Sequence, residues 1–380
     1  MAPPAAAPAA TVARTERVEF SRLPTVADSD LVGAWPAWLA SCRVLARGNG
    51  ARAAQWTAAC TAADRVEPRD AAAIRAFLAA HFDAWRIDPL DAAGAVTRGR
   101  LTGYYEPELV GSRERRGAFI VPLARPPADL LSVDLGPLMA DPAARLRGRL
   151  VDDGGRRRVL PYWTREELTG GDRLKGLELL WLDDPIEAFF LQVQGSGRVR
   201  IAGGRDDGAV VRIGYADTNG HPYRSIGRWL IERGELSLDD ASMQGIQAWA
   251  RANPGRIPEL LNQNPSYVFF RELPLGDPNA GPVGAQNVTL TAGYSAAVDP
   301  AFTPLGAPIL IDSTHPGTRA PLTRLAIAQD TGSAIRGPAR VDLYWGTGRA
   351  AGELAGRSRD DVTVWMLLPK GTAAGDWGAR

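Results

Sequence analysis

Apolar residues recur at helical spacing through the N-terminal part of the chain. This repeat predicts helices between residues 28 and 85. Pro36 must lie in the first turns of its helix or interrupt it, and Asp70 is placed to cap the last of these helices. The Trp and Phe residues of this repeat are expected in the core, and Ile74, Phe77, Leu78 and Phe82 on the buried face of the last helix. The positions that carry the repeat are Leu31, Trp35, Trp38, Leu39, Cys42, Leu45, Trp56, Cys60, Ala63, Ile74, Phe77, Leu78 and Phe82.

From about residue 96 to 220 the pattern changes to alternating residues with frequent Gly and Pro, which favours strands. Strands are expected near 96–110, 158–163 and 210–215. The stretch 189–197 alternates apolar and amide side chains before a glycine turn, and this alternation predicts another strand. One face of that strand would carry Phe190, Gln192, Gln194 and Ser196.

Helical spacing returns over residues 223–262, and short apolar runs follow it. A short helix is also expected around 349–355. Six strands within about 100 residues, with no long helix between them, suggest a compact barrel. The six expected strands are 267–273, 288–298, 308–311, 325–329, 341–345 and 362–368.

Composition places the chain among ordinary globular proteins. Its 380 residues suggest two or three domains. The formal net charge of +1 gives no reason to expect nucleic acid or an anionic membrane as a partner. No run approaches the roughly 20 apolar residues of a membrane span. Residues 1–16, rich in Ala and Pro, are expected to form a disordered tail, and the protein is expected to be a monomer.

The two cysteines, Cys42 and Cys60, lie in helical patterns. They are either joined by a disulfide or buried as free thiols. Neither is expected to be catalytic, because no neighbouring His or Lys would lower a thiol pKa. Three histidines and two cysteines give no zinc spacing, so neither a metal nor a cofactor is expected.

Three aspartates, Asp299, Asp330 and Asp342, occupy strand or turn positions within a short stretch of the chain. A carboxyl at the end of a rigid strand is well held for proton transfer, and burial or a neighbouring carboxylate raises its pKa. The plain alternative is that Asp is a common turn residue.

Aromatic and amide side chains accompany these carboxylates. Aromatic faces cover the apolar side of a sugar ring, and amides pair with hydroxyl and N-acetyl groups, so an uncharged sugar polymer is a suitable substrate. Any single aromatic residue more often belongs to the core than to a binding site. The candidates are Tyr104, Tyr105, Tyr162, Trp163, Gln192, Gln194, Asn219 and Tyr223.

Other catalytic interpretations are weaker. Asp330-Thr-Gly332 is the aspartic-protease triplet, but such enzymes need two loops, and Asp312-Ser-Thr314 lacks the glycine. Walker, HExxH and Gly-x-Ser-x-Gly motifs are absent from the sequence. Ser196 between two glycines, with His221 as a base, lacks the nucleophile-elbow pattern and is better interpreted as a polar strand terminus.

Several long blocks resemble the membrane-bound lytic murein transglycosylase A (MltA) family, whose C-terminal region is a three-aspartate (3D) domain. The resemblance runs from about residue 98 to 369. One departure is Tyr294, where many members carry Arg. The blocks are Thr102-Gly-Tyr-Tyr-Glu-Pro107, Asp184-Pro185, Phe189 to Gly197, Gly214 to Tyr223, Asn264 to Phe270, Gly281-Pro-Val-Gly284 and the region of the three aspartates.

The resemblance implies a mainly β fold with N-terminal and middle helices (α+β). A double-psi β-barrel domain would be built from both ends of the chain, with a smaller β-barrel domain inserted and the glycan in a groove between them. The expected ranges are a tail at 1–16, an N-terminal helical part at 17–107, the inserted barrel at 108–265 and the double-psi barrel part at 266–380.

The implied activity is that of a periplasmic, outer-membrane-associated lyase acting on peptidoglycan glycan strands. It would cleave the β-1,4 bond between N-acetylmuramic acid and N-acetylglucosamine and leave 1,6-anhydro ends. Asp330 would act as acid and then as base, which departs from the usual pair of carboxylates. A non-catalytic wall-binding module is the alternative. Asp342 and Asp299 would support Asp330, and the substrate residues would be Thr102, Gly103, Tyr104, Tyr105, Gln192, Gln194, Gly195, Ser196 and Tyr223.

Overall fold

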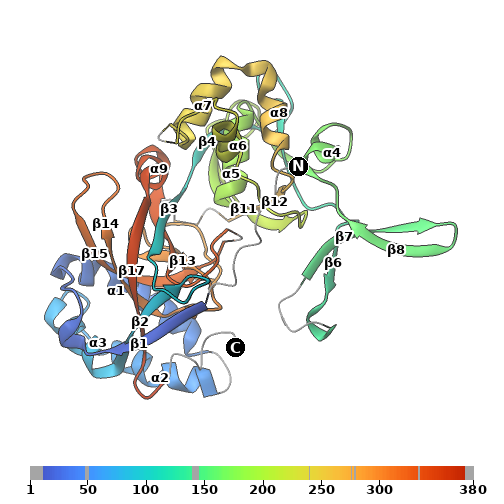
Figure 1. The fold of residues 1–380 in the computed structure, drawn as a ribbon. Coiled ribbons are helices and arrows are strands. Elements are labelled where there is room, and N and C mark those ends of the chain that lie inside the picture. The colour runs from blue at the N-terminus through green and yellow to red at the C-terminus, as the bar shows by residue number, and fades with distance from the viewer. Residues whose placement is uncertain are drawn as a thin grey trace. The chain divides into compact units, whose positions relative to one another are not determined.

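The computed structural model in Figure 1 divides into two compact units. The terminal unit comprises residues 1–105 and 279–380, and the insert unit comprises residues 106–278. The sequence had placed the boundaries of the insertion at 107/108 and 265/266. The structure describes residues 12–47, 51–138, 145–238, 240–274, 276–277, 280–332 and 334–372.

The expected N-terminal helices are present as α1 (Asp28–Leu45), α2 (Ala51–Ala63) and α3 (Ala71–His81). α1 continues through Pro36, and Asp70 caps α3 by accepting a hydrogen bond from the N–H of Ala73. Phe82, expected on the buried face of a helix, instead begins strand β2 (Phe82–Leu90). Pairing of β2 with a C-terminal strand far along the chain overrides the local helical repeat there.

Eight strands of the terminal unit form one sheet in the order β1-β2-β17-β14-β15-β13-β16-β3, and β17 also pairs with β3. The pairings from β17 through β14, β15, β13, β16 and β3 therefore return to β17. Besides β2, the bounds are β1 (Val12–Val18), β3 (Gly99–Glu106), β13 (Ser295–Val298), β14 (Pro308–Thr314), β15 (Pro321–Asp330), β16 (Arg340–Thr347) and β17 (Arg359–Pro369).

Two expectations for the terminal unit need correction. Residues 12–16, assigned to a disordered tail, belong to β1, which pairs antiparallel with β2; residues 1–11 of that tail lie outside the described residues. The strand expected over 288–298 is only β13, because the preceding residues form a loop that a bridge between Val283 and Thr289 closes. The short helix expected near 349–355 is α9 (Gly348–Arg357).

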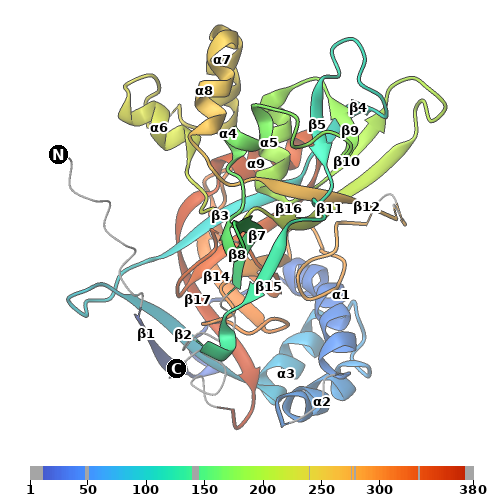
Figure 2. The ribbon, with the colours of Figure 1, turned by 90° about the vertical axis from the view of Figure 1, so that its right-hand side faces the viewer.

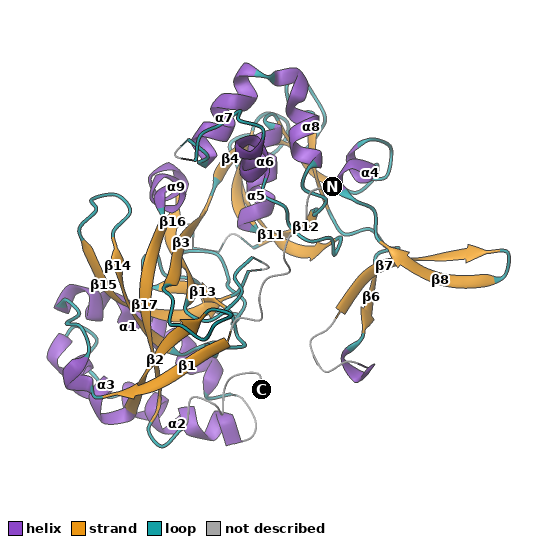
Figure 3. Cartoon of the chain, in the orientation of Figure 1, coloured by secondary structure: helices purple, strands orange, loops and turns teal. Residues whose placement is uncertain are grey.

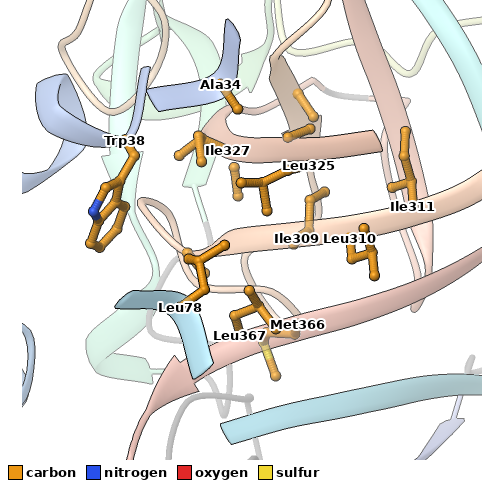
Figure 4. Close-up of a cluster of buried hydrophobic side chains, with 14 of the residues drawn as sticks. Ala34, Trp38, Leu78, Ile309, Leu310, Ile311, Leu325, Ile327, Met366 and Leu367 are labelled. Carbon is orange, nitrogen blue, oxygen red and sulfur yellow. The ribbon is translucent and has the colours of Figure 1, made fainter. Parts of the chain in front are cut away.

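The core of the terminal unit lies between α1, α3 and the sheet, and Figure 4 shows part of it. Trp38 of α1 packs against Trp56 of α2 and Phe82 of β2, with ring centroids 5.9 and 5.5 Å apart. Each large apolar side chain buried here stabilises the fold by about 1.5–3 kcal/mol. A disulfide joins Cys42 to Cys60 and so ties α1 to α2, which confirms the first of the two expectations for the cysteines.

The insert unit holds a six-stranded sheet in the order β12-β11-β10-β4-β9-β5 and a separate three-stranded sheet, β6-β7-β8. The edge strands β5 and β12 of the larger sheet lie close to each other. Its strands are β4 (Glu108–Ser112), β5 (Val121–Ala124), β6 (Leu131–Asp134), β7 (Arg145–Asp153), β8 (Arg156–Pro161), β9 (Glu178–Leu182), β10 (Ser196–Ile201), β11 (Val210–Thr218) and β12 (Val268–Leu273).

The expected middle helical region of residues 223–262 holds α6 (Ile226–Glu232), α7 (Met243–Ala252) and α8 (Ile257–Asn262), which Figure 2 shows gathered together. The described residues also include three short 3-10 helices, Phe20–Arg22, Gly136–Leu138 and Pro254–Arg256. The α-helices are α4 (Arg165–Thr169), α5 (Pro185–Gln194), α6 (Ile226–Glu232), α7 (Met243–Ala252) and α8 (Ile257–Asn262). Among the described residues, no helix combines the length and apolar character needed to cross a membrane.

Helix α5 replaces the strand expected over 189–197, as the purple ribbon in Figure 3 shows. Asp184 accepts hydrogen bonds from the N–H groups of Ile186 and Glu187, and Pro185 occupies the first turn. Gly195 ends the helix in the left-handed conformation with φ of 80°. The predicted strand over 189–197 was therefore wrong, because helix-capping residues on both sides of this short alternating run favour a helix.

Candidate functional site

Asp330 and Asp342 flank the same residue on a central strand. β13 lies between β15 and β16, with Ala297 opposite Asp330 on one side and Asp342 on the other. The register between β13 and β15 shifts at this point, so that Ala296 pairs with Ala328 and Ala297 with Asp330. A bulge of this kind turns a side chain away from the direction that regular alternation would give it, and bulges are common beside active sites.

Three donors reach the carboxyl group of Asp330. The Tyr104 hydroxyl donates to Oδ2 at 2.8 Å, and the N–H groups of Ala285 and Thr331 both donate to Oδ1 at 2.9 Å. Burial raises the pKa of Asp330 above its usual value, although these three hydrogen bonds act against the rise. The donors are all neutral, so the carboxyl group is oriented without being held as an ion.

Asp342 is the second carboxyl of the site. Thr102 donates its hydroxyl to Oδ1 of Asp342 at 2.5 Å, and Arg340 donates to the Thr102 hydroxyl at 2.8 Å. Burial raises the pKa of Asp342 to about 6; Thr102 and Arg340 lower this pKa, and the charge of Asp330 raises it. Burial, followed by the charge of Asp330, holds the pKa of Tyr104 well above its usual value, so Tyr104 remains a proton donor.

Strand β3 supplies four of the expected substrate residues. Thr102 and Tyr104 share a face because side chains alternate along a strand, and both reach the aspartates. A Cβ at Gly103 would lie 2.3 Å from Nε1 of Trp345, so only glycine fits there. Tyr105 packs on α9, where a Cβ at Gly352 would lie 2.9 Å from its ring.

Asp299 follows β13 and is buried. Its Oδ2 accepts from the N–H of Gly337 at 2.7 Å, and its Oδ1 accepts from the N–H of Ala301 at 3.1 Å. Within the described ranges, no hydrogen bond joins Asp299 to Asp330 or Asp342. Asp299 therefore fixes the turns that follow β13 and precede β16.

In the insert unit, the candidates surround the end of α5. Gln192 is buried, and its Oε1 accepts from Nη2 of Arg165 at 2.6 Å. The Gln192 side chain therefore forms part of the interior of the insert unit. Gln194 and Ser196 are partly exposed. Gly195 forms the helix cap between them, and Tyr223 is 41% exposed.

Sequence reasoning missed the residues that act through backbone or buried contacts. Ala285 contributes only its peptide N–H, and its one signal was the nearby Gly281-Pro-Val-Gly284 block. Arg165 is buried and also donates to the carbonyl groups of Asn264 and Ser266, and no pattern in the sequence marked it. In the described part of the chain, no group of three or more His, Cys, Asp or Glu side chains could hold a metal ion.

Comparison with known proteins agrees with this architecture. Residues 100–271 match the model of the MltA specific insert domain, and residues 294–368 match the 3D domain. Membrane-bound lytic murein transglycosylase A of Escherichia coli K12 is 33% identical over 293 residues, which cover 75% of this chain and 69% of that protein.

Solved structures extend the likeness over nearly the whole chain. The crystal structure of MltA from Neisseria gonorrhoeae is 37% identical, with a TM-score of 0.77, and the alignment covers 96% of this chain and 95% of that one. The structure of E. coli MltA with bound chitohexaose is 26% identical, with a TM-score of 0.67 and coverage of 93% of each chain. The chain described here belongs to the MltA family of lytic murein transglycosylases.

Proposed function

We propose that this protein is a peptidoglycan lytic transglycosylase that uses Asp330 alone as acid and then base. It cleaves the β-1,4 bond between N-acetylmuramic acid and N-acetylglucosamine and leaves 1,6-anhydro ends. Family membership supports the reaction. The observation that carries the mechanism is the carboxyl group of Asp330, which neutral donors orient and whose pKa burial raises.

In the first step, protonated Asp330 gives its proton to the glycosidic oxygen as the bond from that oxygen to C1 of the muramic acid breaks. Oδ1 already accepts two peptide N–H groups, whereas Oδ2 accepts only the Tyr104 hydroxyl among the described donors. The transferable proton therefore sits on Oδ2. General acid help of this kind is worth about 10² to 10⁴ in rate.

In the second step, the 6-hydroxyl oxygen of the same muramic acid attacks C1. Its proton passes to the Asp330 carboxylate, which restores the acid without any water being consumed. The positive charge that develops at C1 needs a stabiliser, and the substrate's own N-acetyl group fills this role, as in substrate-assisted hydrolases.

The glycan contacts are also part of the proposal. Thr102, Gly103, Tyr104 and Tyr105 would contact the substrate near Asp330. Gln194, Gly195, Ser196 and Tyr223 would do so from the insert unit, with Gln192 acting through the end of α5. A neutral sugar oligomer, chitohexaose, is bound in the E. coli relative, which supports an uncharged glycan as ligand. Asp299 and Asp342 would support the site rather than transfer the proton.

Fold detail and location belong to the same proposal. The returning circuit of six strands in the terminal unit supports a double-psi β-barrel, and the close edges of the insert sheet support a smaller barrel. The E. coli relative is called membrane-bound, which supports a periplasmic, outer-membrane-associated protein. A monomer remains the prediction.

Mass spectrometry of purified glycan strands after incubation with the protein tests the proposed function. The expected products carry 1,6-anhydro ends, one water lighter than hydrated reducing ends. Hydrated ends would identify a hydrolase instead. An unchanged glycan that still binds the protein would identify a wall-binding module.

A further inference from the structure

The loop that brings Ala285 to Asp330 is tightly built. The N–H of Gly284 donates to the carbonyl of Val288 at 2.9 Å, and the N–H of Asn287 donates back to Gly284 at 2.8 Å. A Cβ at Gly284 would lie 2.6 Å from the carbonyl oxygen of Gln329. The loop therefore lies directly against the end of β15, where a side chain would push it away.

Gln286 anchors this loop to the rest of the terminal unit. Its N–H donates to the carbonyl of Gln329 at 3.0 Å, one residue before Asp330. Its side chain is buried, and Oε1 accepts from the hydroxyl of Ser41 on α1 at 2.7 Å. The loop is thus bound on one side to β15 and on the other to α1.

Gln329 completes the connection. Its Nε2 donates at 2.8 Å both to Oγ of Ser41 and to the carbonyl of Ala37, and its Oε1 accepts from Ser295. Ser41, Gln329 and Ser295 have no exposed surface. The hydrogen bonds of Ser41, Gln286 and Gln329 therefore link α1, the loop and the end of β15. The proposed reaction uses none of these side chains directly.

We propose that Ser41, Gln286 and Gln329 form a positioning network that holds the Ala285 N–H on Oδ1 of Asp330. This inference rests on the proposed function of Asp330. By keeping Oδ1 occupied, the network leaves Oδ2 as the oxygen that carries the proton toward the glycan. Ser41 reaches Asp330 only through this network, so it is a positioning residue and not a catalytic one.

The network makes a directional prediction for proton transfer. The Ala285 hydrogen bond stabilises the ionised form of Asp330 and lowers its pKa. Loosening the loop removes that bond and raises the pKa of Asp330 further. The fall of activity at high pH, which reports loss of the acid's proton, then moves to higher pH. The turnover rate falls about 10- to 100-fold, because the carboxyl group is less well oriented.

The experiment compares Gln286→Met, Ser41→Ala and the double variant with the wild type. Gln286→Met keeps the length of the side chain and removes its polar atoms. Anhydro-product release is measured across pH, and the ¹³C resonance of the Asp330 carboxyl, assigned by its absence in Asp330→Asn, is titrated in each protein. Both single variants are expected to raise this pKa and slow turnover. The double variant is expected to match them instead of adding their effects.

Two controls separate positioning from simple loss of stability. Ser41→Thr keeps the hydroxyl and should keep the wild-type pH profile even if its melting temperature falls. Leu31→Ala destabilises the same helix from a buried apolar position near its start, and Leu31 has no polar side-chain atom with which to join the network. An unchanged Asp330 titration in folded Gln286→Met, or an equal shift in Leu31→Ala, would overturn the proposal. Because the titration needs no turnover, a wild type that releases no anhydro product would refute the function separately.

Discussion

Asp330 in the terminal unit and Glu106 in the insert unit are carboxyl groups with opposite kinds of partner. In the described part of the chain, Asp330 receives its hydrogen bonds from the Tyr104 hydroxyl and two peptide N–H groups, all neutral. Glu106 has no exposed surface and lies 2.8 Å from Nε of Arg198 and 3.0 Å from Nε of Arg212.

The difference separates a reactive carboxyl from a structural one. Neutral donors orient Asp330 and leave burial free to raise its pKa, so the group can hold a proton and release it. Two guanidinium groups form ion pairs with Glu106, and this pairing offsets the cost of burying charge. Burial alone therefore does not identify a general acid; the charge of the partners decides.

The largest expected effect comes from removing the acid. Asp330→Asn and Asp330→Ala should lower anhydro-product release by about 10⁴-fold or more, because the same group serves both proton transfers and Asn cannot deliver a proton. Circular dichroism should show an unchanged fold, and much of the glycan binding should remain. Turnover at the wild-type level by folded Asp330→Asn would end the single-acid mechanism. Turnover lost only in Asp342→Asn would move the acid to that residue.

Substitution of Glu106, the structural carboxyl, should lower stability instead of removing the chemical step. Glu106→Gln leaves two buried guanidinium groups without their counter-ion, and breaking a buried pair in this way typically costs about 3–5 kcal/mol. Urea unfolding followed by fluorescence should show a lower midpoint for Glu106→Gln and a nearly unchanged one for Asp330→Asn. Equal midpoints for Glu106→Gln and the wild type would remove the contrast between the two carboxyl groups.

The sequence identified the residues around Asp330 better than those around Glu106. Thr102, Tyr104, Asp330 and Asp342 were expected together because a family motif and strand-end positions marked them, and the structure joins them by hydrogen bonds. Glu106 lies in the same motif, yet nothing in the motif shows that two arginines from later strands would enclose it.

Two other failures have different physical causes. The run 189–197 alternates over too few residues to separate strand from helix, and the local signals that mark α5 are the Asp184-Pro185 start and the Gly195 end. The hydrogen bond between Ser41 and Gln286 joins residues 245 positions apart, so no local sequence pattern could predict it. Local spacing thus predicts elements and their ends, whereas the partners that set a pKa come from distant parts of the chain.

Asp342 gives a smaller effect with a definite sign. Its pKa is about 6 in the folded protein and about 3.9 in an unfolded chain, so the folded state binds the proton more tightly. The stability this provides is complete below about pH 4 and is lost as the pH rises through 6. Asp342→Asn cannot ionise, and it should therefore gain about 1–3 kcal/mol relative to the wild type between acidic and neutral pH.

The measurement is the free energy of unfolding of both proteins at about pH 4 and pH 7.5. Loss of the hydrogen bond from Thr102 lowers the stability of Asp342→Asn at both pH values. It does not change how the stability difference between the two proteins varies with pH. A difference between the two proteins that does not change with pH would mean that Asp342 ionises normally. Residual anhydro-product release by Asp342→Asn is also expected, because the substitution leaves Asp330 and its three donors in place.

Tyr104→Phe tests whether a neutral donor tunes the pKa of Asp330 without fixing the charge of its carboxyl group. The Tyr104 hydroxyl stabilises the ionised carboxyl and lowers the pKa of Asp330, so its removal should raise that pKa. Hydrogen bonds to charged groups are worth about 1.5–3 kcal/mol, which corresponds to a shift of about one to two pH units. The high-pH fall of anhydro-product release should move upward by that amount.

Tyr344→Phe is the matched control, because it removes a neighbouring hydroxyl that contacts Thr347 and lies on a ring 5.3 Å from that of Tyr104. A downward shift in Tyr104→Phe, or the same upward shift in Tyr344→Phe, would show that the hydroxyl of Tyr104 does not set the proton affinity of Asp330.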